Sequence, residues 1–214
     1  VLVLGDANNS IDAFDGADTI TFSAAAATAV TIQGMGGNDQ ITANVDAGGG
    51  VLIQTNVGND SVYFSGDFDS SQIQLGAGND LLSFSGEFAS DVSDAYIYGG
   101  GGNDTIQFMN EIQSGGGFSE ATAATVFGGA GADVFSADNG DGTGAAFTFG
   151  YSAASDSTLT AMDTIGFIGG DSEGIYRFNY VPGSTDAATF SASNATASNG
   201  IATFMATYAA DVTS

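Results

Sequence analysis

The sequence predicts an all-β protein: a right-handed parallel β-roll or β-helix of about six to seven coils, with similar tight turns along one edge and a C-terminal cap. Three observations lead to this fold class. An aspartate recurs along the 214-residue chain at intervals of 20–30 residues, as Asp18, Asp39, Asp60, Asp80, Asp104, Asp133 and Asp163. Hydrophobic and polar residues alternate on both sides of it, and glycine stands two residues before it in six of the seven units.

The alternation has a period of two residues, which is typical of β-strands. After each aspartate, the second residue is Ile20, Ile41, Val62, Leu82, Ile106, Phe135 or Ile165, and the fourth is Phe22, Ala43, Phe64, Phe84, Phe108, Ala137 or Phe167. Seven residues before it stand Ile11, Ile32, Ile53, Ile73, Ile97 and Val126. Each unit therefore holds two short strands, and stacked units can bury a face that one unit cannot bury alone.

The glycines two residues before the aspartates are expected to take positive φ and to let the chain reverse tightly. Stacking then aligns the aspartates in a ladder at about 4.8 Å, where like charges repel. The chain has 25 Asp and Glu but one Lys or Arg, Arg177, so the counter-charge has to come from solution. Carboxylate and carbonyl oxygens select a hard cation, and the loose geometry favours Ca²⁺ over Mg²⁺.

These turns resemble the RTX, or haemolysin-type, calcium-binding repeat, whose nonapeptide is G-G-x-G-x-D-x-U-x. GGGGNDTIQ at 99–107 and GGAGADVFS at 128–136 match in full, whereas GMGGNDQIT at 34–42, TNVGNDSVY at 55–63, LGAGNDLLS at 75–83 and AFDGADTIT at 13–21 lack one or both leading glycines. The resemblance implies a parallel roll that binds several calcium ions. The predicted metal-binding residues are Asp18, Asp39, Asp60, Asp80, Asp104, Asp133, Gly34, Gly37, Gly58, Gly76, Gly78, Gly99, Gly102, Gly128 and Gly131.

The spacing is at least twice the nine residues of the family's uninterrupted repeats. We therefore expect calcium turns along one edge only, with the opposite edge closed by divergent turns at 44–50, 65–70, 85–94 and 109–123. Three parts are predicted: stacked coils at 1–138, a capping segment at 139–182 and an Ala/Ser/Thr-rich strand or tail at 183–214. The cap rests on resemblance, because residues 147–178 are similar to the segment that closes RTX rolls in secreted metalloproteases and haemolysin-type proteins.

Several features allow two interpretations. The Gly-Asn-Asp turns could be metal-free hairpin turns, although six aspartates in register favour metal. Asn38, Asn59, Asn79 and Asn103 precede four of the aspartates and fit a structural side-chain ladder better than a ligand set. Phe68, Phe88 and Phe118 either seal the core at the divergent edge or form an exposed docking stripe, and the acidic loop at 138–142 is either plain loop or a further ion site.

Composition excludes several functions. A formal net charge of −24 argues against nucleic-acid binding and against attraction to an anionic membrane. The chain has no His and no Cys, so the usual nucleophile and base pairs are missing and no enzyme activity is expected. No apolar stretch of about 18 residues predicts a transmembrane segment.

The sequence therefore suggests a secreted, calcium-dependent structural protein at the cell surface, a domain of a self-assembling surface layer or extracellular filament that associates with copies of itself. The alternative is a calcium-binding module of an adhesin, toxin or secreted enzyme whose active part lies elsewhere. The family resemblance implies export by a type I secretion route.

Overall fold

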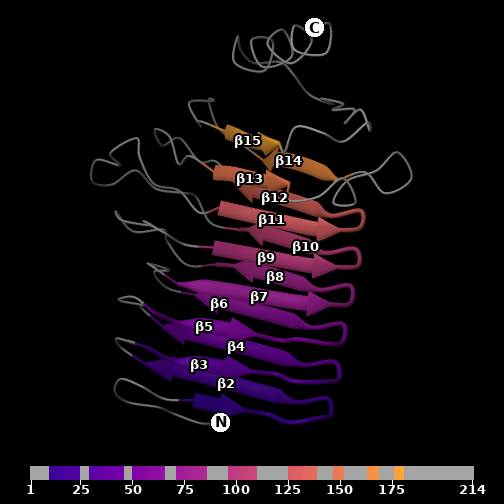
Figure 1. Ribbon diagram of the computed structural model, residues 1–214. Helices are drawn as coiled ribbons and strands as arrows, with labels where there is room; N and C mark the ends of the chain where they lie inside the picture. The colour runs from indigo at the N-terminus through magenta and orange to yellow at the C-terminus, as the bar shows by residue number, and fades with distance from the viewer. Residues whose placement is uncertain are drawn as a thin grey trace, which may run out of the picture.

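The protein is a parallel β-solenoid made of two facing sheets. The structure, a computed structural model, describes residues 10–24, 29–45, 50–65, 71–85, 96–109, 125–138, 147–151, 163–168 and 176–180. Figure 1 shows the chain winding from one sheet to the other and back, so that successive coils stack along one axis. The all-β parallel architecture predicted from the repeat is confirmed.

The odd-numbered strands form an eight-stranded sheet in the order β1-β3-β5-β7-β9-β11-β13-β15. They are β1 (Ser10–Asp12), β3 (Thr31–Gln33), β5 (Leu52–Gln54), β7 (Gln72–Ala77), β9 (Tyr96–Gly101), β11 (Thr125–Ala130), β13 (Phe147–Tyr151) and β15 (Tyr176–Tyr180). The even-numbered strands form a seven-stranded sheet in the order β14-β12-β10-β8-β6-β4-β2. They are β2 (Thr19–Ala24), β4 (Gln40–Val45), β6 (Ser61–Ser65), β8 (Leu81–Phe84), β10 (Thr105–Phe108), β12 (Val134–Asp138) and β14 (Thr164–Ile168).

The register between neighbouring strands follows the aspartate spacing. Ile32 pairs with Ile53 and Ile53 with Ile73 in the first sheet, although the intervals differ by one residue. Thr105 of β10 likewise pairs with Val134 of β12 across an interval of 29 residues. The extra residues therefore lie outside the paired strands, and equivalent positions of the repeat stay level along the solenoid.

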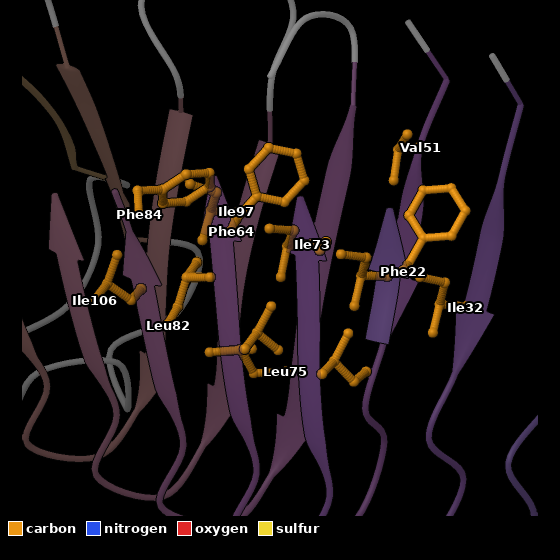
Figure 2. Close-up of a cluster of buried hydrophobic side chains, with 14 of the residues drawn as sticks. Phe22, Ile32, Val51, Phe64, Ile73, Leu75, Leu82, Phe84, Ile97 and Ile106 are labelled. Atoms are coloured by element: carbon orange, nitrogen blue, oxygen red, sulfur yellow. The ribbon is translucent and has the colours of Figure 1, made fainter. Parts of the chain in front are cut away.

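The core lies between the two sheets, where alternate side chains point inward (Figure 2). Among the positions that the alternation predicts to face inward, those from Ile20 to Phe135 whose side chains the structure describes are all buried. Ile11, at the N-terminal end, is partly buried and packs against this core. Phenylalanines follow one another along the axis: the rings of Phe84 and Phe108 stack at 4.9 Å, and Phe108 meets Phe135 at 5.4 Å. Burying such aromatic side chains is the main apolar contribution to stability.

Several predicted features lie outside the described residues: nearly all of the divergent turns, Phe68, Phe88, Phe118, most of the loop at 138–142 and the 183–214 segment. Within the segment predicted as a cap, β13 and β15 continue the first sheet, and β14 continues the second. In the described part of the chain, no helix has the length and hydrophobicity needed to cross a membrane.

Candidate metal centre

The candidate site is the column of tight turns that join each odd strand to the even strand after it. Figure 1 shows these turns, from β1–β2 to β11–β12, aligned on one edge of the solenoid. The glycines two residues before the aspartates have φ between +122° and +149°, as predicted, and they are Gly16, Gly37, Gly58, Gly78, Gly102 and Gly131. From Gly37 onward, an added Cβ would lie 1.7–1.9 Å from the carbonyl oxygen of the equivalent glycine one coil earlier. The close approach of one turn to the next therefore requires glycine at this position.

The residue four positions before the aspartate also has a left-handed backbone conformation, but it is not always glycine. Phe14, Met35 and Asn56 have φ of 70°, 76° and 71°, whereas later turns place Gly76, Gly100 and Gly129 there. Non-glycine residues in this region cost on the order of 1–3 kcal/mol each. The three N-terminal turns thus keep the backbone geometry of the glycine turns despite a side chain that disfavours it.

The aspartate side chains turn into the protein. Five of them, Asp39, Asp60, Asp80, Asp104 and Asp133, are at most 5% exposed, and Asp18 is partly exposed. In each pair of neighbouring coils, Oδ1 of the later aspartate accepts a hydrogen bond from the backbone N–H of the earlier one, at 2.7–3.0 Å. This backbone-to-carboxylate ladder runs without a break from Asp18 to Asp163.

The second carboxylate oxygen is in a different situation. Oδ2 is buried and has no hydrogen-bond partner in Asp18, Asp39, Asp60, Asp80 and Asp104. A buried polar atom without a partner costs about 1–3 kcal/mol, and more when it carries charge. The column therefore presents a series of enclosed oxygens that lack a counter-charge within the described structure.

Burial changes the acidity of these carboxyl groups. It raises the pKa of Asp80 to about 6, because desolvation outweighs the hydrogen bond from the Asp60 N–H. It raises the pKa of Asp104 to about 7 for the same reason, with the charges of Asp133 and Asp80 adding to the effect. The pKa of Asp39 is also raised, mainly by burial. Without a bound cation, Asp39, Asp80 and Asp104 are therefore harder to ionise than an exposed aspartate.

The oxygens fit calcium better than other metals. No group of three or more His, Cys, Asp or Glu gathers within the described residues, so acidic side chains alone do not form a cage there. The turns at Gly34 and Gly99 instead bring one carboxylate oxygen close to a backbone carbonyl of the next coil, and Ca²⁺ accepts such mixed oxygen sets in flexible geometry. The unpartnered Oδ2 atoms give a hard cation a place in this column.

The asparagines form a second column on the outside of the turns. Oδ1 of Asn38 accepts the backbone N–H of Asn59, Asn59 accepts that of Asn79, and Asn79 accepts that of Asn103, at 2.7–2.8 Å. The predicted asparagine ladder exists. Its hydrogen bonds run from backbone N–H to side chain, however, and not from side chain to side chain as the sequence analysis expected. These bonds join consecutive coils, so the asparagines have a structural role.

A third column, on the outer face of the first sheet, was missed by the sequence reasoning. Gln33 donates from Nε2 to Oε1 of Gln54 at 2.9 Å, and Gln54 does the same to Gln74 at 2.8 Å. The signal was present in the repeated IQ pairs, because each glutamine stands six residues before its aspartate. Beyond Gln74 the column becomes aromatic, with Tyr98 stacked on Phe127 at 4.9 Å.

Comparison with known families identifies the turns. The family model of the RTX calcium-binding nonapeptide repeat matches four copies, at residues 1–26, 29–50, 96–107 and 125–143. The chain carries RTX calcium-binding repeats. The family predicted from the motifs is thereby confirmed, and the chain is a calcium-binding RTX β-roll module. No curated protein and no solved structure gives a significant match to the chain.

The RTX copies do not cover the turns evenly. The turns at Asp18, Asp39, Asp104 and Asp133 lie within them, whereas those at Asp60 and Asp80 lie outside all four. All predicted aspartate and glycine ligands nevertheless lie in the one column of turns, so the structure brings the whole predicted set together. Which of them ligate calcium stays a prediction.

Proposed function

We propose that this protein folds when calcium binds and serves as a secreted structural protein at the cell surface, without enzyme activity. The observation that supports the proposal is the column of aspartates, in which the Oδ2 atoms of Asp18, Asp39, Asp60, Asp80 and Asp104 are buried and have no hydrogen-bond partner. Bound calcium would supply the missing positive charge and oxygen ligation. Its binding energy would then become folding energy, as in other metal-dependent domains.

The calcium gradient across a cell membrane makes this coupling useful. Extracellular calcium modules have dissociation constants of about 0.1–1 mM, so they are empty where free calcium is low and filled outside. With a net charge of −24, the metal-free chain repels itself and stays open. We propose that it leaves the cell unfolded, by a type I route, and folds on arrival.

We further propose that the folded roll is right-handed, has about six to seven coils with the segment at 139–182 as its cap, and assembles with copies of itself into a surface layer or filament. The side-chain ladders support a building role, because they stiffen the roll along its axis. Gln33, Gln54 and Gln74 form such a ladder on the outer face of one sheet.

Circular dichroism during a calcium titration tests the coupling to folding. We expect a β-strand spectrum to develop cooperatively as calcium is added, to disappear with chelator, and to form poorly with the same concentration of Mg²⁺. A strand spectrum that chelator leaves unchanged would contradict the proposal.

Electron microscopy and light scattering of the folded chain test the structural role. Ordered filaments or sheets that form only with calcium support it. A calcium-loaded chain that remains monomeric at all concentrations would favour a module of a larger adhesin, toxin or enzyme instead.

A further inference from the structure

The outer face of the first sheet carries no charged side chain from β3 to β11. Two side chains of each strand point outward there, and the strand pairing sets them in two rows along the solenoid axis. The row nearer the turns consists of Gln33, Gln54, Gln74, Tyr98 and Phe127. The second row consists of Thr31, Leu52, Gln72, Tyr96 and Thr125. All of these residues are at least partly exposed, and none of them is Asp, Glu, Lys or Arg.

The lack of charge on this face matters because the chain as a whole is strongly acidic. It has 25 Asp and Glu against one Lys or Arg, so two copies repel each other in solution. Facing or burying like charges in a contact adds a further cost. Two copies can therefore meet closely only where neither presents acidic side chains, and the outer face from β3 to β11 meets that condition.

Charge alone does not choose between the two sheets, because the outward side chains of the second sheet are also uncharged from β2 to β10. The order of the side chains does distinguish them. Thr42, Tyr63 and Ser83 follow one another at the centre of the second face. Within the described residues they make no side-chain hydrogen bond or ring contact, so a partner would have to order them on binding.

The side chains of the first face, in contrast, are already ordered by each other. The glutamine ladder runs from Gln33 to Gln74, and the rings of Tyr98 and Phe127 stack at 4.9 Å. Phe127 in turn covers Gly150 of β13, where an added Cβ would lie 2.0 Å from its ring. Long side chains lose rotamer freedom when a partner immobilises them. Here that ordering is complete before a partner arrives.

The first face is also flat and regular. The planes of the stacked Tyr98 and Phe127 rings differ by 2°, so these neighbouring coils are related by translation with little rotation. Figure 1 shows the odd-numbered strands stacked in one direction along the solenoid. The outward rows thus repeat at the strand spacing of about 4.8 Å, and a second copy of this chain has the same repeat. Paired sheets with amide ladders and stacked aromatics interdigitate in this way.

The glutamine ladder keeps hydrogen-bonding groups for a partner. A glutamine amide has two N–H donors, and its carbonyl oxygen has two lone pairs. Gln54 uses one N–H towards Gln74 and accepts one hydrogen bond from Gln33. One donor and one acceptor of Gln54 are therefore left within the described structure, and an uncharged amide of a second copy can satisfy both.

We propose that the calcium-loaded chain pairs with a second copy of itself through the outer face of the first sheet, with β7 at the centre of the contact. The inference rests on the proposed self-assembly and adds which surface makes a contact. Because both copies use the same patch, the contact closes a pair. Five strands span only about 20 Å, so the pairing is weak and is measured at high protein concentration.

Salt dependence separates this contact from one that charges hold together. Screening weakens the repulsion between two chains that each carry a net charge of −24. Pairing through an uncharged face should therefore strengthen when NaCl is raised at constant saturating calcium. A pairing that weakens with NaCl would contradict the proposal, because it would indicate a contact made by charged groups.

Analytical ultracentrifugation of the full calcium-loaded chain, with circular dichroism as the check of folding, tests the face. Gln72→Glu places a carboxylate in β7, on a side chain that makes no hydrogen bond in the described structure. Gln107→Glu is the matched control, because Gln107 is an equally half-buried glutamine on the outer face of the second sheet, in β10. We expect Q72E to weaken pairing about tenfold or more and Q107E to leave it unchanged.

Mixing charge variants adds a measurement that depends on a gain of pairing. Q72K alone should pair weakly, but an equal mixture of Q72E and Q72K should recover pairing, because opposite charges then face each other. Equal effects of Q72E and Q107E, or no recovery in the mixture, overturn the proposed face and leave self-assembly intact.

Two results with the unmodified chain have different consequences. If the calcium-loaded chain stays monomeric at all concentrations, the proposed self-assembly itself fails. If this monomer also binds to cross-linked dextran, and Q72E but not Q107E abolishes that binding, the face belongs to a neutral glycan and the proposed pairing is wrong.

Discussion

Single glycines decide whether one coil can lie on the next. Gly78 has φ of +149°, and a Cβ there would lie 1.7 Å from the carbonyl oxygen of Gly58, which belongs to the backbone and cannot move aside cheaply. Gly101 lies in the strand before the next turn, without positive φ, and a Cβ there would meet nothing within 4 Å. Two glycines in corresponding parts of the repeat therefore carry different constraints.

We predict that Gly78→Ala destabilises the calcium-loaded protein by about 3 kcal/mol or more, because it combines backbone strain with a clash between coils. Gly101→Ala is the matched control and should change the free energy of unfolding by no more than about 0.5 kcal/mol. Urea denaturation in saturating calcium measures both. Equal effects of the two substitutions would show that the close stacking of the turns is not what glycine provides.

At the scale of the strands, ladders outside the core add specific links between neighbouring elements. Gln54 is the centre of one, because it donates to Gln74 of β7 and accepts from Gln33 of β3. Gln72 is equally half-buried, begins β7 and makes no side-chain hydrogen bond within the described part of the chain. The two glutamines thus separate the contribution of the ladder from that of a polar surface residue.

Gln54→Ala should lower the free energy of unfolding by about 1–3 kcal/mol, since it removes two hydrogen bonds. Gln72→Ala should have an effect within about 0.5 kcal/mol. Thermal unfolding in calcium, followed by circular dichroism, measures the difference. If both variants melt together, the glutamine column contributes no stability.

At the scale of the whole molecule, the charge of the aspartate column governs stability in the absence of metal. The folded-state pKa of Asp80 is raised from 3.8 to about 6 and that of Asp104 to about 7, both mainly by burial. A raised pKa means that folding favours the protonated form. The stability from these groups is fully present below about pH 4 and is lost as the pH rises towards 6–7.

We therefore predict that the metal-free chain shows more β-strand signal at pH 4.5 than at pH 8, as measured by circular dichroism in metal-depleted buffer. Asp104→Asn removes the carboxyl group with the higher of these two raised pKa values, so the difference between the signals at the two pH values should shrink in that variant. In saturating calcium the order should reverse, because protons compete with calcium for carboxylates. A metal-free strand signal that is stronger at pH 8 would contradict this account.

The periodic features could be predicted from the sequence because they are local. Gly37 and Asp39 stand in the turn itself, and the alternation around Ile41 and Ala43 needs only the geometry of one strand. Parallel pairing of identical units then follows, because a slip by one residue would turn the whole hydrophobic face outward. Sequence reasoning could therefore predict the family, the parallel roll, the inward-facing residues and the turn glycines.

The arrangement of oxygens required the tertiary structure. Whether Asp39 bonds the backbone of Asp18, and whether Thr55 reaches the carbonyl of Leu75, depends on the height and rotation of coils about 20 residues apart. Sequence reasoning treated the aspartates as a column of equivalent charges. The structure instead distinguishes the two oxygens of each carboxylate, because one is bonded to the backbone of the neighbouring coil and the other is enclosed in the protein. The sequence by itself determined that the chain coils and where it turns, because those choices are local and repeat. Only the packing of coil on coil decided how each carboxylate is bonded and how deeply it is buried, because both depend on the neighbouring turn.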